Sequence, residues 1–430
     1  MISPKQFLVG FAEVDITPAE LPLMAGYYYE RRATGVHDRL YARSMAIGDG
    51  QTVVVLCVTD LIFSPVELVA ATRAAVQEKC RLPPEQVILA AIHSHTSPDL
   101  RNEKAYAAGL PERLAECVAQ ALQKLAPRDL RVGRTQPHPG VQFIRRYRMK
   151  DGSVRTNPGI GNPEIQTALG TPDPDLMLLM AEEKGKLRGG VVHFALHCDT
   201  VGGTELSADW IHYLRERMRG EMGKDFALLT PIGPSGDINH WDVFGEGALR
   251  GFAETQRIGH NLGDGALKAC GNLQPIPVGP VRVLRRCVEV STRMPTPEQL
   301  AQARVLMGQP PPPGVDFTLD RVIALRHMRV AEAGPHLSLE VTVLAFGNVA
   351  FATMPCELFT ELGRRIKRAS PFEFTFVCTH ANGGCGYIGE MHNYAEGGYE
   401  VTSSIVTPGA GEALVEAAVT LLQEAAQGRR

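Results

Sequence analysis

A strand–helix–strand pattern at residues 52–92 constrains the fold of this chain more than any other feature. Residues 52–63 read TVVVLCVTDLIF, an apolar, β-branched run without helical periodicity. Ser64-Pro65-Val66-Glu67 predicts a helix start, with Ser64 as the N-cap, and the helix runs to about Cys80. QVILAAI at 86–92 is a second apolar strand. Such a βαβ unit builds a parallel sheet, so we expect an α/β fold with a mixed, partly parallel sheet flanked by helices.

The rest of the chain predicts one large domain over residues 1–430, because no repeat or low-complexity block interrupts it. Residues 128–180, rich in Gly, Pro and Asn, are expected to form a long irregular wall of a pocket. Residues 321–354 alternate as a strand meander with a hairpin turn at Gly347-Asn348, and QPPPPG at 309–314 is a stiff connector. The other expected helices are at about 103–125, 248–269, 297–307 and 409–425, and the other strands at 190–197, 226–232 and 278–292.

Charge and composition exclude two classes of partner. Of the 430 residues, 44% are apolar, which is enough for a sizeable core, and 44 Lys and Arg nearly balance 47 Asp and Glu, so a nucleic-acid partner is not expected. The longest apolar runs fall far short of the roughly 20 residues that span a bilayer. The N-terminal MISPKQFLVGFAEVDITP has no secretion signal, which predicts a cytoplasmic protein unless a leader was removed. The oligomeric state stays open.

The stretch VILAAIHSHTSPDL places His93 and His95 just after a strand. Ligand sites in open α/β sheets gather at the carboxyl ends of the strands, so both histidines are expected there. Because residues two apart on an extended chain point to opposite faces, a kink must precede the pair before both address one site. Two polar histidines that merely cap a strand explain this pattern equally well. Metallo-β-lactamase-like hydrolases also use a His-x-His pair, but they need an Asp where Ser97 stands, so the sequence disfavours a hydrolase of that class.

Two further side chains that can bind zinc lie at strand exits. His197 ends GVVHFALH, and Glu357 follows NVAFATMP at the expected start of a helix. Each has an ordinary structural explanation by itself, as a buried histidine or as a first-turn acid that the helix dipole stabilises. Taken with His93, they supply two histidines and one carboxylate, which are the three protein ligands of a catalytic zinc site that keeps its fourth position open.

Two loops complete the candidate site. Residues 380–401, HANGGCGYIGEMHNYAEGGYEV, form an expected glycine-rich loop that carries Tyr387 and Tyr399. PIGPSGDINHW at 231–241 presents Asp237 and Asn239, which we assign to substrate binding. A phosphate-binding loop is excluded there because the GxxxxGK pattern is absent.

Over nearly its whole length the sequence resembles the catalytic domain of the neutral, non-lysosomal ceramidases, zinc-dependent amidases of N-acylated sphingoid bases. The similar segments include FLVGFAEVDITP, GVHDRLYARSMAI, AIHSHTSPD, FALHCDT, MPCELFTELGRR, the Asn382 to Tyr387-Ile388 spacing, Tyr399-Glu400 and FIRRY. The resemblance implies Zn²⁺ as cofactor and an N-acyl amide or lipid as substrate. The ligands that it implies are His93, His197, Glu357 and Tyr387, and the catalytic residues are His95, Arg145 and Tyr399.

Two departures bear on the substrate. The family's Gly-Asp-x-Ser-Pro-Asn becomes Gly236-Asp237-Ile238-Asn239-His240, without the serine near the scissile amide, and the family's C-terminal β-sandwich domain is absent from the sequence. The main prediction is a zinc-dependent hydrolase that cleaves a linear N-acyl amide smaller and more soluble than ceramide. The alternatives are a zinc hydrolase of another class, such as an amidohydrolase barrel or an esterase, or a degenerate relative that only binds.

Overall fold

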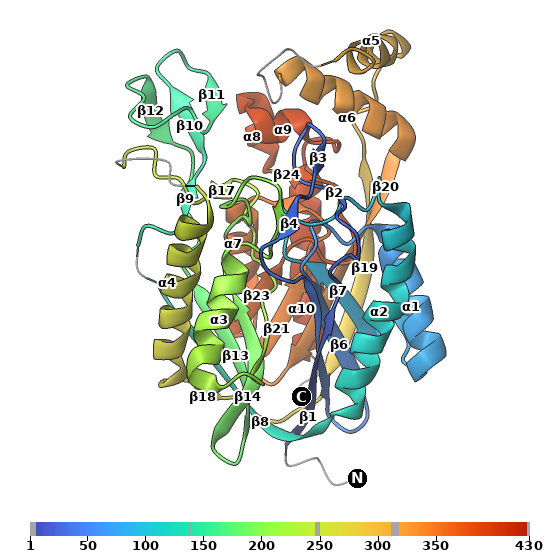
Figure 1. The fold of residues 1–430 in the computed structure, drawn as a ribbon, viewed down its shortest axis with the longest axis vertical. Helices are drawn as coiled ribbons and strands as arrows, with labels where there is room; N and C mark the ends of the chain where they lie inside the picture. The colour runs from blue at the N-terminus through green and yellow to red at the C-terminus, as the bar shows by residue number, and fades with distance from the viewer. Residues whose placement is uncertain (1–5, 138, 246–249, 311–317, 428–430) are drawn as a thin grey trace.

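The computed structural model describes residues 6–137, 139–245, 250–310 and 318–427, which form two packed β-sheets covered by helices (Figure 1). The larger sheet has nine strands, in which eight follow the order β16-β14-β13-β8-β1-β5-β6-β7 and β18 pairs with β8. Among the described strands of this sheet, only β14–β16 and β6–β7 pair in parallel. Its strands are β1 (Phe7–Asp15), β5 (Tyr41–Gly48), β6 (Val53–Thr59), β7 (Val87–Ala91), β8 (Ala126–Thr135), β13 (Leu176–Glu183), β14 (Lys186–His193), β16 (Ala227–Leu229) and β18 (Gln274–Pro275).

The smaller sheet has four strands in the order β19-β20-β21-β23, and it separates two hydrophobic cores. The strands are β19 (Arg282–Ser291), β20 (His336–Phe346), β21 (Val349–Thr353) and β23 (Phe374–Cys378). Side chains alternate along β20 and β21: Leu344 and Phe351 belong to the core shared with the larger sheet, whereas Val343 and Ala352 belong to the core beneath α10. This period of two is what a strand buried on both faces requires.

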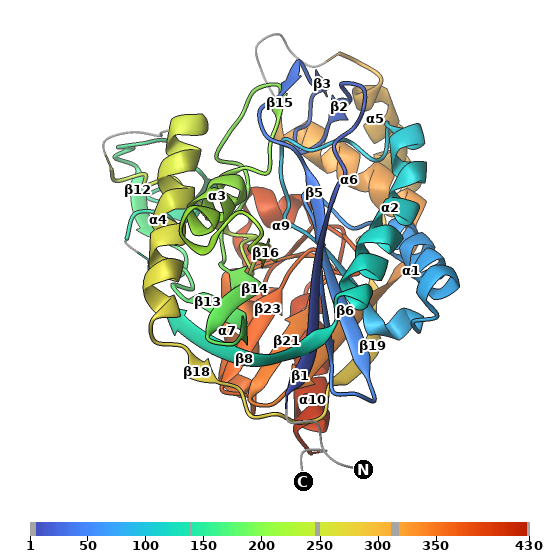
Figure 2. The same ribbon diagram turned by 60° about the horizontal axis from the view of Figure 1, so that its bottom comes forward.

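Helices cover the outer faces of both sheets, so the molecule has a helix–sheet–sheet–helix arrangement (Figure 2). Helices α1 and α2 pack on one half of the larger sheet and α3 and α4 on the other, while α7 and α10 cover the smaller sheet. The helices are α1 (Val66–Cys80), α2 (Lys104–Gln123), α3 (Trp210–Met222), α4 (Phe252–Cys270), α5 (Pro297–Met307), α6 (Leu319–Ala333), α7 (Thr360–Ala369), α8 (Met391–Glu396), α9 (Tyr399–Ser403) and α10 (Ala410–Gln427). No helix of the described residues is long and apolar enough to cross a membrane.

The predicted βαβ unit is confirmed, since β6 and β7 pair in parallel across α1. The predicted cap is wrong: Pro65 occupies the N-cap position of α1, which has no side-chain cap hydrogen bond, and Ser64 is buried. The cap of α5 does form as a capping box between Thr296 and Gln299.

Three longer segments differ from the sequence prediction. Residues 321–335 belong mostly to α6 rather than to a meander, because buried side chains recur there at helical spacing, and only β20 and β21 form the hairpin, whose turn is Gly347-Asn348 as predicted. The predicted excursion at 128–180 is wrong at both ends, which belong to β8 and β13 of the larger sheet, whereas the residues between these two strands do leave that sheet. Most of the predicted connector at 309–314 lies outside the described residues.

A small sheet and several two-stranded pairs gather at the top of Figure 1, around α8 and α9. The sheet holds β10 (Arg146–Met149), β11 (Val154–Thr156) and β12 (Ile165–Ala168). The pairs are β2 (Leu23–Met24) with β3 (Arg31–Arg32), β4 (Gly35–Val36) with β15 (Glu205–Leu206), β9 (Phe143–Ile144) with β17 (Ile238–Asn239), and β22 (Glu357–Leu358) with β24 (Tyr387–Ile388). They are built from segments that follow β1, β8, β14, β16, β21 and β23 in the chain.

Candidate metal centre

His93 follows β7 in a left-handed backbone conformation, with φ of 61°. This is the kink that the sequence required, and it turns His93 and His95 toward the same point. The Nδ1 atom of His93 lies 3.0 Å from the carbonyl oxygen of Ile62, which orients the ring. Gly26 lies against His95 so closely that a Cβ at position 26 would come within 2.8 Å of it, so only glycine is accommodated.

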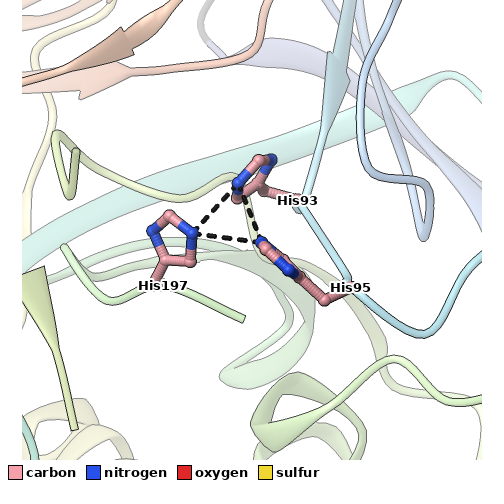
Figure 3. A group of neighbouring side chains, drawn as sticks. All are labelled: His93, His95 and His197. Carbon is pink, nitrogen blue, oxygen red and sulfur yellow. Dashed lines mark hydrogen bonds between the residues drawn. The ribbon is translucent and has the colours of Figure 1, made fainter. Parts of the chain in front are cut away.

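Three imidazole Nε2 atoms meet at one buried point (Figure 3). The Nε2 atom of His197 lies 3.1 Å from that of His93 and 3.1 Å from that of His95, and the His93 and His95 Nε2 atoms are 3.3 Å apart. His197 comes from the segment after β14, and its Nδ1 lies 3.3 Å from the carbonyl oxygen of Ser235. Sequence analysis assigned two of these histidines to the metal and His95 to catalysis, and the structure brings all three together.

The protonation states of these rings favour a bound cation. A carbonyl oxygen only accepts hydrogen bonds, so the Nδ1 atoms of His93 and His197 carry the protons and their Nε2 atoms hold lone pairs. Burial lowers the pKa of His95 to about 4 and the pKa of His197 well below its usual value. Facing lone pairs at 3.1 Å repel one another, and a cation between them converts that repulsion into ligation.

Glu357 adds a carboxylate to the three histidines. Its Oε2 atom lies 3.3 Å from Nε2 of His93 and, within the described part of the chain, is buried without a hydrogen-bond partner. Burial raises the pKa of Glu357, but the neighbouring His93 and Arg145 outweigh that effect and hold the pKa below its usual value. An ionised, unsatisfied carboxylate oxygen facing a histidine lone pair is a donor set suited to zinc.

Tyr387 is placed beside Glu357 by the pairing of β22 with β24. Glu357 and Tyr387 are register partners in this parallel pair, although they are far apart in sequence. Burial raises the pKa of Tyr387 well above 10, while the charge of Arg145 opposes this rise. The helix predicted to begin at Glu357 begins instead at Thr360.

Arg145 and Tyr399 line the same site from another side. The Arg145 guanidinium carbon lies 5.2 Å from the centre of the Tyr387 ring, and its Nε donates to Oε1 of Glu400 at 2.7 Å. Nη2 of Arg145 is buried and has no hydrogen-bond partner among the residues described. The Tyr399 ring packs edge-on against Tyr387 at 5.6 Å, and its hydroxyl lies 2.8 Å from that of Tyr28. Tyr399 begins α9, so the predicted loop contains two short helices.

Asp237 and Asn239 are buried beside the site, where internal hydrogen bonds occupy them. Asp237 Oδ1 accepts from the backbone N–H of Thr360 at 2.8 Å and from its hydroxyl at 2.9 Å, so it caps the start of α7. Asn239 donates to Asn157 and accepts from the backbone N–H of Trp241 at 2.9 Å. The turn that contains them also carries Ser235, whose carbonyl oxygen orients His197.

Sequence analysis missed three residues of this site. The His380 ring stacks on His93 with centroids 4.1 Å apart. Asp199 accepts from the hydroxyl of Tyr27 and lies 3.9 Å from Nδ1 of His95. Glu400, which binds Arg145, is fully buried. Each lies in a segment that already contained a candidate residue or adjoined one: Asp199 in HCDT, His380 in THAN and Glu400 in GGYE. A polar residue in such a segment was the signal that could have identified it.

Comparisons with known proteins identify the fold. No protein-family model matches the chain, and no curated protein matches it in sequence. The solved structure of neutral ceramidase from Pseudomonas aeruginosa is similar, with a TM-score of 0.76 and 18% sequence identity over 97% of this chain and 75% of that chain. A structure described as ceramidase complexed with C2 gives the same TM-score and identity and is covered to 76%. The protein therefore has the α/β fold of the neutral ceramidases.

Proposed function

We propose that the protein is a zinc-dependent hydrolase of linear N-acyl amides. The observation that carries the proposal is the meeting of three buried imidazole Nε2 atoms within 3.1–3.3 Å, beside an unsatisfied carboxylate oxygen. His93, His197 and Glu357 supply three of the donors, and Tyr387, the register partner of Glu357, supplies a phenolic oxygen as the fourth. The third imidazole, His95, faces the metal position without being a ligand. The fold shared with neutral ceramidases, whose name denotes amide hydrolysis, supports the reaction class.

His93, His197, Glu357 and Tyr387 are the proposed zinc ligands. Zinc bound there would lower the pKa of a coordinated water to about 7 and polarise a carbonyl group. Burial keeps His197 neutral, and the charge of Arg145 favours the ionised form of Glu357, so both donors are ready to bind at neutral pH.

The remaining residues move a proton and stabilise charge. Because His95 is neutral and its Nε2 faces the centre, that atom accepts a proton and passes it to the leaving amine nitrogen. The guanidinium of Arg145 and the hydroxyl of Tyr399 donate to the oxygen of the scissile carbonyl as negative charge develops on it. Nη2 of Arg145 has no competing partner among the described residues, which leaves it available for this role.

Asn239 supports a substrate other than ceramide. It stands where the ceramidase motif has a serine, and both ends of its amide are already hydrogen-bonded. A short, soluble N-acyl amide is therefore the proposed substrate, with long-chain ceramide cleaved poorly.

Metal content and hydrolysis, measured on the same preparations, test the proposal. The wild-type protein is expected to retain about one zinc per chain and to release fatty acid from N-acyl amides. His95→Gln should retain zinc and lose activity, whereas the control His260→Gln, at a half-buried position of α4 away from the site, should keep both. A protein that neither binds zinc nor hydrolyses any N-acyl amide or ester would be a binding protein; cleavage of esters alone would make it an esterase.

A further inference from the structure

The Arg329 side chain of α6 has no hydrogen-bond or ion-pair partner within the described part of the chain. Its Nε atom is buried without a hydrogen bond, and its guanidinium forms no ion pair. Arg326, one helical turn earlier, differs: its Nη1 donates to the carbonyl oxygen of Thr402 at 2.9 Å and its Nη2 lies 2.8 Å from Nε2 of His327. The two arginines therefore have different roles, and that of Arg326 is to hold α6 against α9.

Arg329 lies beside the candidate metal centre. Helix α6 packs on α9, which begins with Tyr399 (Figure 1). Burial raises the pKa of Tyr28, and Arg329 is among the charges that oppose this rise. Glu357 and Tyr399 also lie close enough to act electrostatically on Arg329. Arg329 thus lies on the side of the site that holds Tyr399, the hydroxyl donor of the proposed mechanism, and its neighbour Tyr28.

A second unpaired arginine adds to this charge. Arg101 belongs to the loop between His95 and α2, its exposed side chain forms no ion pair with any described residue, and it lies near Arg329. Burial, and then the like charge of Arg101, lower the pKa of Arg329. A partly buried guanidinium beside a like charge costs stability, and an anion placed between them removes that cost.

We propose that Arg329, with Arg101 at the rim, binds an anionic group of the substrate. This inference rests on the proposed function and specifies its substrate class. In the proposed substrate the acyl group is an alkyl chain without charge. The anionic group must therefore be on the amine part of the amide, as in an N-acyl amino acid or an N-acyl amine phosphate. Carboxylate and phosphate share the geometry that an arginine fork recognises.

Matched substrates with and without the charge test the proposal on the zinc-loaded protein. N-nonanoylglycine is compared with N-nonanoylglycinamide, and N-nonanoyl-O-phosphoethanolamine with N-nonanoylethanolamine. The wild type is expected to favour the anion of at least one pair by about 10-fold or more in kcat/KM. The pair that shows the larger preference distinguishes carboxylate from phosphate.

Arg329→Gln should abolish this preference and leave kcat/KM for the neutral substrates within about 2-fold. Because the substitution removes an uncompensated charge, the urea midpoint of unfolding should not fall. The control Arg304→Gln, which removes an exposed arginine of α5, should leave both substrate classes unchanged. Arg329→Lys should retain part of the preference, since a point charge remains without the fork.

Three results would overturn the inference: a wild type with no anion preference, an Arg329→Gln variant that loses activity equally on charged and neutral substrates, or one that is destabilised. If the protein cleaves no amide, the proposed function fails, but the anion site can still be tested by measuring the binding of a ligand that cannot be cleaved. The ketone 4-oxododecanoate has the shape of N-nonanoylglycine but no scissile amide. Calorimetry should show that it binds the wild type about 10-fold more tightly than its neutral carboxamide, and that Arg329→Gln removes the difference. Equal affinities would refute the anion site in that case too.

Discussion

Replacing Glu400 by Gln tests whether the buried ion pair behind the site holds Arg145 in place. Glu400 is fully buried, and its Oε1 accepts from Nε of Arg145 at 2.7 Å. Its Oε2 accepts from the hydroxyl of Thr156 at 2.7 Å and lies 3.7 Å from Nε of Arg146. The variant keeps the shape of the side chain and removes the negative charge that two buried guanidinium groups share.

The expected loss of stability is large because the charges left behind are buried. The side chains of Arg145 and Arg146 are only 8% and 1% exposed. Removing one partner of a buried ion pair typically costs 3–5 kcal/mol, so the free energy of unfolding should fall by about 3 kcal/mol, with Thr156 still able to donate to the amide oxygen. Arg145 loses its anchor as well, which should lower kcat by about 10²-fold while zinc content stays unchanged.

Glu183→Gln is the matched control, since Glu183 pairs with Arg188 at 2.9 Å in a more exposed position, away from Arg145 and Arg146. It should cost less than about 1 kcal/mol. Urea denaturation of both variants at one pH, followed by far-ultraviolet circular dichroism, measures the two differences. The reasoning is refuted if Glu400→Gln unfolds within about 0.5 kcal/mol of the wild type, or if the two variants lose equal stability.

Three further outcomes are expected. His93→Ala and His197→Ala should each lose zinc and activity together, because a site with one ligand gone binds weakly; stoichiometric zinc in metal analysis of either variant would remove that residue from the ligand set. Tyr399→Phe should retain zinc and lower kcat, since only a hydroxyl donor is lost, whereas a higher KM at unchanged kcat would make Tyr399 a substrate-binding group. Burial lowers the pKa of His193 to about 4, from about 6.5 for an ordinary histidine. Below pH 6.5 the unfolded chain therefore takes up the proton first, and the free energy of unfolding falls as pH drops toward 4, by at most about 3 kcal/mol. His193→Gln, which preserves a donor to the carbonyl oxygen of Val377, should flatten urea-unfolding stability between pH 4 and 6.5, and an unchanged slope would contradict this origin.

The elements predicted correctly are those whose cause is local. The β6–α1–β7 unit follows from two β-branched runs and a proline at the helix start, and the turn at Gly347-Asn348 follows from residues that accept its backbone. The prediction for α6 was wrong because its apolar residues also match an alternating pattern over short windows, and packing against α5 and α9 selects the helix. Likewise β8 and β13 lie among Gly- and Pro-rich stretches, and only their sheet partners reveal them as strands.

The candidate site divides in the same way. The sequence by itself determined that His93, His197 and Glu357 each follow an apolar strand, which places them at the carboxyl ends of strands, and that a kink must turn His93. It did not determine that the third imidazole would lie as close as the other two. The distance of 3.1 Å between Nε2 atoms depends on how the segments after β7 and β14 meet, where the N–H of His95 donates to the carbonyl oxygen of Cys198 at 3.1 Å.

Only the tertiary structure decided which charges are paired. Glu400 reaches Arg145 across 255 positions of sequence, and Arg329 has no hydrogen-bond or ion-pair partner in the described chain. Local sequence cannot encode which arginines are paired. Burial and the approach of distant segments determine whether a guanidinium group meets a carboxylate, a carbonyl oxygen or a site open to substrate. The sequence therefore specified the chemical groups of this protein, and the fold specified which of them act together.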